Sequence, residues 1–510
     1  MSDNFRTTAI KVTALLMLML LVSCYKEAVI IPESIGDAGL YFKINNNEVA
    51  IDLHTGLCLV YIEQFGTNYP ANITFGNIKK LEINDNNIVD QNTYIFSDIN
   101  AADSWQISMI TKDGKTIRSH LKFTLLPVVQ LFHSTVIPDE FKVPALIKIT
   151  GNRAAQPYIG YCGIEIRGGQ AIRRPKKSFS ISLSNDNQAN TYASSAILGM
   201  RLNNSWILDA MYADLSKMRN RVSFDLWQKI LETHKPPAVH DGFYINGQAV
   251  EVFANYKYLG LFFLSEKFDE ELLYLKTDKL INGFLLYKSE EWSNATKFLA
   301  TADTLGKYRF WCGWEQKYPA PGKVSCWHPL FELIDYIANS DDEDFREGIF
   351  KRMDIDNLID YFILMNITKA TDNTGKNIFL VKNHAGGLFY ICPWDLDATW
   401  GRWWDSNPAD AETILTNNLY ERLFYCNPEG FKKRMKERWH ILRQEVITYE
   451  AVQDQFAYYA NMFKISGALA REAEKWPESI NKPEDEQAYI NEWTKKRIAV
   501  LDNFFERLEQ

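Results

Sequence analysis

The stretch Thr371–Gly401, TDNTGKNIFLVKNHAGGLFYICPWDLDATWG, places three aspartates, three asparagines and two lysines around two short apolar runs. The runs IFLV and GGLFYIC are separated by the turn-forming residues Asn383–Gly387, a pattern typical of a β-hairpin. A hairpin returns the chain to the loop where it started, so Asp395 comes back beside Asp372 and Asn377. The sequence therefore predicts that acidic and amide groups converge at one end of this hairpin.

Such convergence needs a compensating charge. Carboxylates that lie close together repel one another, which raises their pKa values. A divalent cation removes the conflict, and carboxylate and amide oxygens are donors that suit Mg²⁺. Asp372 and Asn377 have four residues between them, and Asp395 follows after a hairpin, which is the spacing of the protein-kinase catalytic loop and its metal-binding aspartate. A turn capped by its own Asp and Asn side chains, or a loop that holds structural calcium, would explain the same spacing.

Two units are expected beyond the N-terminus. Residues 39–126 alternate apolar and polar residues in short runs separated by turn signals, which predicts a β-sandwich domain. Residues 127–510 begin with further strand-like runs and continue as a mainly helical region. The expected fold class is α+β, with the β-sandwich followed by a two-lobed domain that has a β-rich small lobe and a helical large lobe.

The first 24 residues are typical of a bacterial lipoprotein signal peptide. A positively charged start precedes the apolar run Val12–Val22, which is too short to cross a bilayer comfortably. The run is followed by a small residue and then Cys24, as in a lipobox, where the cysteine becomes lipidated. We expect residues 1–24 to be the signal peptide, residues 25–38 a tether, and the protein to be lipid-anchored in the bacterial cell envelope, periplasmic or at the surface. An uncleaved membrane anchor is the alternative.

Charge and cysteine content limit the partners. The net charge is −8 over 510 residues and no long basic run occurs, so the positive surface typical of nucleic-acid binding is missing. No segment after the signal peptide is apolar enough to cross a membrane, which leaves the lipid anchor as the only membrane contact. The six cysteines after Cys24 lack zinc spacing. Cys312 and Cys326 share one Trp-rich loop, where a disulfide and two free thiols are both compatible with export.

An ordered set of segments between Val128 and about Trp493 resembles the CotH-type kinases, an atypical branch of the protein-kinase-like fold. The segments are CGIEIRGG with RRPKKSFSISL, WILDAMYADLSKMRNRVSFDLW, VEVFANYKYLGLFFLSEKFD, DNTGKNIFLVK, CPWDLDATWG and RLFYCNPEGFKKRMKERWHILR. The most specific part is PWDLD with the upstream Asp-x4-Asn. The resemblance implies that Asp372 is the catalytic carboxylate, that Asn377 and Asp395 hold the metal, and that Asp397 assists them or orders the loop. It implies ATP and Mg²⁺, or another divalent cation, as cofactors.

The resemblance also implies nucleotide contacts in the small lobe. The turn Arg167-Gly168-Gly169 would lie over the nucleotide, and Lys176 or Lys177 would reach its phosphates. Because alternate residues of a strand share a face, Lys177 is expected to point inward with the apolar residues that follow it, and Lys176 to face solvent. Two solvated lysines at the start of a strand are the alternative.

Two further residues complete the expected site. Glu266 ends the run GLFFLSE, where a kinase-like fold has the hinge between its lobes, and its backbone is expected to contact adenine; a buried or capping glutamate without a ligand is the alternative. Arg219 matches an arginine on the first helix of the family, for which a structural salt bridge is expected. The chain departs from the family at Gly169-Gln170-Ala171, where small hydroxyl residues are common, so backbone amides alone would cradle phosphate. No acidic partner for the phosphate lysine can be identified in the sequence.

The sequence thus favours an ATP-dependent protein kinase-like lipoprotein that transfers the γ-phosphoryl group to hydroxyl side chains of an exported or surface protein. The alternative is a non-catalytic surface-binding or scaffold lipoprotein with a polysaccharide or protein ligand. The scarcity of ATP outside the cytoplasm favours the alternative. The joint presence of Asp372, Asn377 and Asp395 favours the kinase, since a scaffold has no need of these polar groups. Nucleotide binding discriminates between the two.

Overall fold

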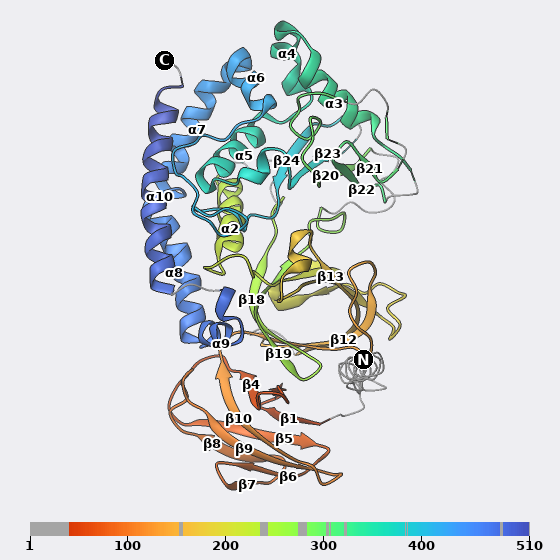
Figure 1. The fold of residues 1–510 in the computed structure, drawn as a ribbon, viewed down its shortest axis with the longest axis vertical. Helices are drawn as coiled ribbons and strands as arrows, with labels where there is room; N and C mark the ends of the chain where they lie inside the picture. The colour runs from red at the N-terminus through yellow and green to blue at the C-terminus, as the bar shows by residue number, and fades with distance from the viewer. Residues whose placement is uncertain are drawn as a thin grey trace, which may run out of the picture.

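The computed structural model describes residues 40–151, 157–234, 243–273, 283–301, 305–306, 308–320, 324–382, 384, 386–479 and 483–508. The expected signal peptide, the tether and Cys24 lie outside these described residues. Within them the chain is a mixed α+β protein, which confirms the predicted class. Figure 1 shows three tiers along the long axis: two N-terminal sheets, a β-barrel, and a region that contains most of the helices.

The N-terminal sheets consist of strands β1–β10. The four-stranded sheet has the order β2-β1-β5-β8, and the six-stranded sheet has the order β3-β4-β10-β9-β6-β7. Phe96 of the first sheet packs on Trp105 and Phe123 of the second, with ring centroids 5.4 and 5.0 Å apart, so the two sheets share one core. The strands are β1 Tyr41–Ile44, β2 Asn47–Glu48, β3 Ala50–Ile51, β4 Leu57–Tyr61, β5 Tyr69–Gly76, β6 Ile78–Ile83, β7 Asn86–Ile88, β8 Asn92–Phe96, β9 Trp105–Thr111 and β10 Thr116–Thr124.

The barrel closes in the order β11-β12-β13-β14-β17-β19-β18, because β11 pairs with β18 in parallel. Apolar side chains from all of its strands fill the interior, including the completely buried Trp206. Its strands are β11 Val128–Phe132, β12 Val143–Thr150, β13 Tyr158–Arg167, β14 Ser178–Ser184, β17 Ser205–Asp209, β18 Gly247–Ala254 and β19 Lys257–Glu266. The short strands β15 Ser195–Ala196 and β16 Leu202–Asn203 form a separate pair.

The helical region surrounds helix α5, whose side chains are almost all buried. The Asp354 side chain begins α5 by accepting a hydrogen bond from the backbone N–H of Asn357, and Lys369 ends the helix in the left-handed conformation. The helices are α2 Arg219–Glu232, α3 His328–Asn339, α4 Asp342–Gly348, α5 Ile355–Thr368, α6 Asn418–Cys426, α7 Phe431–Glu445, α8 Tyr449–Ile465, α9 Ala468–Lys475 and α10 Pro483–Glu506. Helix α9 follows α8 and packs against it, beside the barrel and above the N-terminal sheets (Figure 1).

A five-stranded sheet, β21-β22-β20-β23-β24, lies within the helical region. Its strands are β20 Leu285–Ser289, β21 Phe310–Trp311, β22 Trp314–Tyr318, β23 Ile378–Lys382 and β24 Phe389–Pro393. Strands β23 and β24 are antiparallel with Ile378 opposite Pro393, which confirms the predicted hairpin. Two residues of its turn, Asn383 and Ala385, lie outside the described residues.

Cys312 and Cys326 are both free thiols in the structure, as are the other four cysteines that it describes. Across the described part of the chain, no helix combines the length and the apolar character that a membrane crossing requires.

Candidate functional site

Asn373 joins the two ends of the β23–β24 hairpin. Its buried side-chain amide donates to the carbonyl oxygens of Asn377 at 2.9 Å and of Trp394 at 3.1 Å. Its own carbonyl accepts a hydrogen bond of 2.9 Å from the hydroxyl of Tyr361 on α5. Because these bonds fix both ends of the hairpin to one helix, the residues that flank Asn377 and Trp394 are held next to each other.

Asn377 and Asp395 meet in this arrangement. The Asn377 amide nitrogen lies 3.5 Å from Oδ2 of Asp395. Both residues adopt left-handed backbone conformations, with φ of 57° and 58°, which Asn and Asp tolerate better than most residues. Asn377 is buried and the Asp395 carboxylate is exposed, so the pair presents an acidic group to solvent from a rigid base.

Asp372 lies in the turn Thr371–Thr374 that precedes the hairpin. Its side chain is half-buried, and among the described residues no group donates a hydrogen bond to its carboxylate. Withdrawal from water raises the pKa of Asp372, Lys376 opposes this rise, and the charge of Asp395 adds to it. A carboxylate with a raised pKa is a better proton acceptor than an ordinary aspartate.

Asp397 lies near three other carboxylates. Withdrawal from water and the charges of Asp395, Asp209 and Asp214 raise the pKa of Asp397 well above its ordinary value. The sequence analysis did not identify Asp209 and Asp214. Asp209 directly follows the apolar residues Trp-Ile-Leu at the end of β17, and an acidic residue at that position is the signal that could have identified it.

Asn220 on α2 connects Asp209 to the hairpin. Its amide nitrogen donates to Asp209 Oδ2 at 3.0 Å, and its amide oxygen accepts from the Leu396 backbone at 3.0 Å. The end of barrel strand β17 and the loop that carries Asp395 and Asp397 therefore contact the same side chain.

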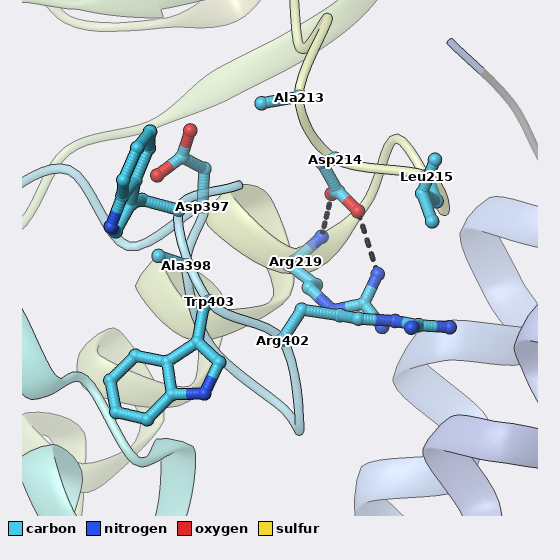
Figure 2. Close-up of a pocket in the computed structure, with 9 residues that line it drawn as sticks. Ala213, Asp214, Leu215, Arg219, Asp397, Ala398, Arg402 and Trp403 are labelled. Carbon is cyan, nitrogen blue, oxygen red and sulfur yellow. Dashed lines mark hydrogen bonds and ion pairs between the residues drawn. The ribbon is translucent and has the colours of Figure 1, made fainter. Parts of the chain in front are cut away.

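A hollow beside Asp397 is shown in Figure 2, lined by Ala213, Asp214, Leu215, Arg219, Asp397, Ala398, Arg402, Trp403 and Trp404. Asp214 faces Arg219 in this view, while the carboxylate of Asp397 points away from that pair. The completely buried Arg219 bonds to Asp214 at 2.8 Å, to Glu486 on α10, and to the Thr399 carbonyl at 2.9 Å. The expectation of a structural salt bridge for Arg219 is therefore confirmed.

The side chains of Asp395, Asn377 and Asp397 fit a metal that also binds a phosphate ligand. Among the described residues, no group of three or more His, Cys, Asp and Glu side chains lies close enough to hold a metal alone. Mg²⁺ is usually bound by one or two carboxylates together with waters and substrate phosphates. Asp395, with the Asn377 amide beside it and Asp397 nearby, provides that kind of partial oxygen shell. The roles of these three residues as metal ligands stay predictions.

The predicted orientation of the two lysines is wrong. Lys176 is buried, with only 2% of its surface exposed, whereas Lys177 is partly exposed. The Lys177 amine donates to the carbonyls of Ile172, at 2.6 Å, and Arg174 within its own turn. The alternation argument failed because both faces of β14 are buried over its first four residues. The apolar residues that follow Lys177 do face the barrel interior, but a lysine on the other face can be enclosed as well.

Lys176 has an acidic partner that the sequence analysis missed. Its amine lies 2.7 Å from Oε1 of the completely buried Glu472 on α9, donates to the Leu261 carbonyl, and lies 4.4 Å above the Phe262 ring. Burial lowers the pKa of Lys176, and the charges of Glu472 and then Asp209 oppose this. Asp209 is thus within electrostatic reach of both Lys176 and Asp397, which links the barrel lysine to the hairpin carboxylates.

The glycine turn after β13 is close to the same loop. The guanidinium of Arg167 lies 5.8 Å from the ring of Trp394, the residue before Asp395. Gly168 has a φ of 113°, and a Cβ there would lie 2.8 Å from the Ala171 side chain, so glycine is needed at this position. Gly169 is exposed, and a Cβ there would meet no other atom. Nucleotide binding by this turn stays a prediction.

The side chain of Glu266 has a structural role. It is completely buried, forms an ion pair with Arg201 at 2.7 Å, and accepts a hydrogen bond from the backbone N–H of Asn246. Its own backbone N–H donates to the Asn246 carbonyl at 2.9 Å. The side chain therefore agrees with the alternative given in the sequence analysis, a buried glutamate. An adenine contact through the main chain stays a prediction, and it is restricted to the carbonyl oxygen.

Comparison with known proteins gives two matches. Residues 164–501 match the protein family described as CotH kinase protein. The inner spore coat protein H of Bacillus subtilis strain 168 is 28% identical over 318 residues, which cover 62% of this chain and 78% of that protein. The family match includes all of the candidate residues from Arg167 to Asp397, and also Glu472. The N-terminal sheets lie outside it.

Proposed function

The chain belongs to the CotH kinase protein family, and we propose that it is an atypical protein kinase that transfers the γ-phosphoryl group of ATP to a hydroxyl side chain of an exported protein. One observation carries the proposal. Asp209 links a buried ion pair between Lys176 of the barrel and Glu472 of α9 to the hairpin loop that carries Asp395 and Asp397: its charge acts on Lys176 and on Asp397, and Asn220 joins it to the Leu396 backbone. Protein kinases combine these same parts: a lysine–glutamate pair, a catalytic-loop Asp-x4-Asn and a metal-binding aspartate.

The proposed architecture has two lobes. The barrel takes the role of the small lobe, and the helical region with its five-stranded sheet takes the role of the large lobe. The nucleotide would bind between them, where Arg167 meets Trp394 and where Asn220 joins Asp209 to Leu396. Lys176 and the Arg167-Gly168-Gly169 turn are the proposed phosphate contacts. Asn377 and Asp395, assisted by Asp397, are the proposed ligands of Mg²⁺, which when bound neutralises charge on the phosphates.

Asp372 is the proposed proton acceptor. In the transfer step the acceptor hydroxyl oxygen bonds to the γ-phosphorus while the bond from that phosphorus to the bridging oxygen of ADP breaks. The hydroxyl proton moves to the Asp372 carboxylate, and ADP leaves. The raised pKa of Asp372 supports this role, because a weakly acidic carboxyl accepts a proton more readily. Lys376 opposes that rise in pKa and so favours the ionised form of the Asp372 carboxyl.

The sequence of the first 24 residues supports a proposed location at the bacterial cell envelope. Lipidation at Cys24 would hold the protein at a membrane surface, and the acceptor would then be an exported or surface protein. ATP is scarce outside the cytoplasm. Nucleotide binding is therefore the first property of the protein to measure.

A second candidate function is a non-catalytic scaffold with a protein or polysaccharide ligand. It is favoured by the enclosure of Lys176, whose side chain is 1% exposed and already bound to protein groups. The two candidates differ in nucleotide chemistry, since a scaffold needs neither ATP nor a metal.

The deciding experiment is a phosphotransfer assay. The chain without residues 1–24 is incubated with ATP labelled at the γ-phosphate, with Mg²⁺, and with peptides that carry Ser, Thr or Tyr. The proposal predicts label on a hydroxyl residue of the protein or a peptide, and labelling that is slower by about 10²–10⁴-fold for Asp372→Asn. Absence of label together with absence of Mg²⁺-dependent ATP binding would favour the scaffold.

A further inference from the structure

The Lys176–Glu472 pair is supported from behind by a second buried ion pair. Arg471, the neighbour of Glu472 on α9, forms two hydrogen bonds of 2.7 Å with the carboxylate of Glu251 on β18. Both Arg471 and Glu251 are buried. Because consecutive residues of an α-helix are held at a fixed angle of about 100° to each other around its axis, Arg471 binding to β18 sets the rotation of α9 and hence the position of Glu472.

Glu472 in turn depends on that rotation. Its Oε2 accepts a hydrogen bond of 2.8 Å from the Leu261 amide while Oε1 pairs with Lys176. Trp476, one turn further along, donates to the Leu259 carbonyl at 2.7 Å. A small displacement of α9 would therefore break the contacts of Glu472 with β19 and with Lys176 together.

The N-terminal sheets reach the same network through Tyr258. The Tyr258 hydroxyl donates to Glu251 Oε1 at 2.8 Å, and its backbone N–H donates to Oδ2 of Asp52 at 2.9 Å. Asp52 lies between β3 and β4, is completely buried, and is also fixed by the amides of His54 and Thr55. A continuous series of hydrogen bonds thus runs from the N-terminal sheets to the residue beside Glu472.

Apolar contacts fix the two parts together at this point. A buried cluster combines residues of the N-terminal sheets with barrel residues: Ala50, Leu57, Leu59, Val128, Phe253 and Tyr258. At the start of α9, a Cβ on Gly467 would lie 3.1 Å from the Ala101 side chain, so the N-terminal sheets also pack closely on that helix.

We propose that Glu251, Arg471 and Tyr258 are positioning residues that hold the Lys176–Glu472 pair in its nucleotide-binding geometry, and that the N-terminal sheets complete this support through Asp52. The inference rests on the proposed function, since it assumes that Lys176 contacts phosphate. It also gives the N-terminal sheets, which lie outside the family match, a part in nucleotide binding that does not require them to touch the nucleotide.

The test compares variants of the full-length protein by two readouts. Arg471→Met removes the pair with Glu251, Tyr258→Phe removes one hydroxyl, and Asp52→Ala removes the contact from the N-terminal sheets. The matched control is Arg438→Met, which removes an ion pair of the same length, 2.7 Å, to Asp360 in the helical region. The first readout is acylation of Lys176 by an amine-reactive reagent, measured by mass spectrometry. The second is affinity for ATP–Mg²⁺, measured by calorimetry at a temperature where every variant is folded.

The inference predicts faster acylation of Lys176 and about two- to thirtyfold weaker ATP–Mg²⁺ binding in Arg471→Met, the usual range for an indirect coupling. Tyr258→Phe and Asp52→Ala should change both readouts in the same direction by less, and Arg438→Met should lower thermal stability while changing neither. If Arg471→Met leaves either readout unchanged, the inference is wrong. If the wild type binds no nucleotide, the proposed function fails, and the acylation readout still decides whether Arg471 holds Lys176.

Discussion

Lys176 Nζ lies 2.7 Å from Glu472 Oε1, although 296 positions of the chain separate the two residues. The lysine precedes the barrel strand β14, and the glutamate comes from a helix near the C-terminus. Both side chains are buried, so each charge depends on the other for compensation. In this chain the acidic partner of the proposed phosphate-binding lysine therefore lies in the C-terminal part of the sequence.

This relationship gives a prediction for the two adjacent lysines. Lys176→Met, combined with Glu472→Gln so that no unpaired charge is buried, should weaken ATP–Mg²⁺ binding by about 10- to 150-fold, because a charge-assisted hydrogen bond contributes about 1.5–3 kcal/mol. Lys177→Met should change the affinity little, since the Lys177 amine is bound to its own turn. Calorimetric titration of both proteins measures the difference. Equal losses for both would reject Lys176 as the phosphate contact.

Gly260 offers a second way to disturb the pair without changing a charge. It lies on β19 with a φ of 116°, and an added Cβ would collide with the Glu472 carboxylate and lie 3.3 Å from Lys176 Cε. Gly260→Ala should therefore weaken ATP–Mg²⁺ binding as well as lower stability. Gly114→Ala is the control, since Gly114 has a φ of 87° but no atom near the position of a Cβ, and it should cost only backbone strain of about 1–2 kcal/mol. Urea unfolding with calorimetry separates the two effects.

Asp269 gives a prediction for the pH dependence of stability. Burial, opposed first by Lys267, raises the pKa of Asp269 from 3.8 to about 6. Because the folded state binds this proton more tightly than the unfolded state, the group's contribution to the free energy of unfolding is present below pH 3.8 and is lost as the pH rises to about 6. Asp269→Asn keeps an oxygen for the Leu272 amide and does not titrate.

The variant should therefore gain stability relative to wild type as the pH rises through that window, by on the order of 2–3 kcal/mol in total. Urea unfolding at several pH values between about 3.5 and about 8 measures this difference in the free energy of unfolding. A difference in free energy between the two proteins that stays constant across the window would show that Asp269 titrates normally.

The proposed lipid anchor is tested at Cys24. Cys24→Ala should abolish lipidation, because the thiol is the attachment atom. The altered protein should leave the detergent phase in a phase-partitioning experiment, while the wild type stays in it. Membrane fractionation of the variant identical to that of wild type would contradict the lipobox and favour an uncleaved anchor.

The sequence predicted the hairpin and the meeting of Asn377 with Asp395 because both depend on local pattern. Alternating apolar residues and turn signals identify the two strands, and antiparallel pairing then brings the flanking polar residues together. The same kind of argument failed at barrel strand β14. Lys176 and Lys177 precede β14, and that strand is buried on both faces, so its apolar pattern does not show which of the two lysines is buried.

Contacts between distant segments could not be predicted. Glu472 occurs in ALAREAEK, which has the composition of an ordinary solvent-exposed helix, and only the docking of α9 on β19 buries it. Glu266 was expected at a hinge, but its partner Arg201 lies 65 residues away in a loop without a marked pattern. Asp209 and Asp214 were overlooked because a single acidic residue after a strand is common, and their significance depends on the proximity of Asp397.

The central claim is that the hairpin carboxylates perform two different tasks, and calorimetric titration of ATP in the presence and absence of Mg²⁺ tests it most directly. The account predicts that wild type binds ATP in a Mg²⁺-dependent manner, that Asp395→Asn loses this dependence, and that Asp372→Asn keeps most of the affinity while its phosphotransfer rate falls by about 10²–10⁴-fold. Melting temperatures of the three proteins serve as the control for folding. If wild type shows no Mg²⁺-dependent binding at millimolar ATP, or if both variants bind ATP and transfer phosphate as wild type does, the kinase assignment is contradicted.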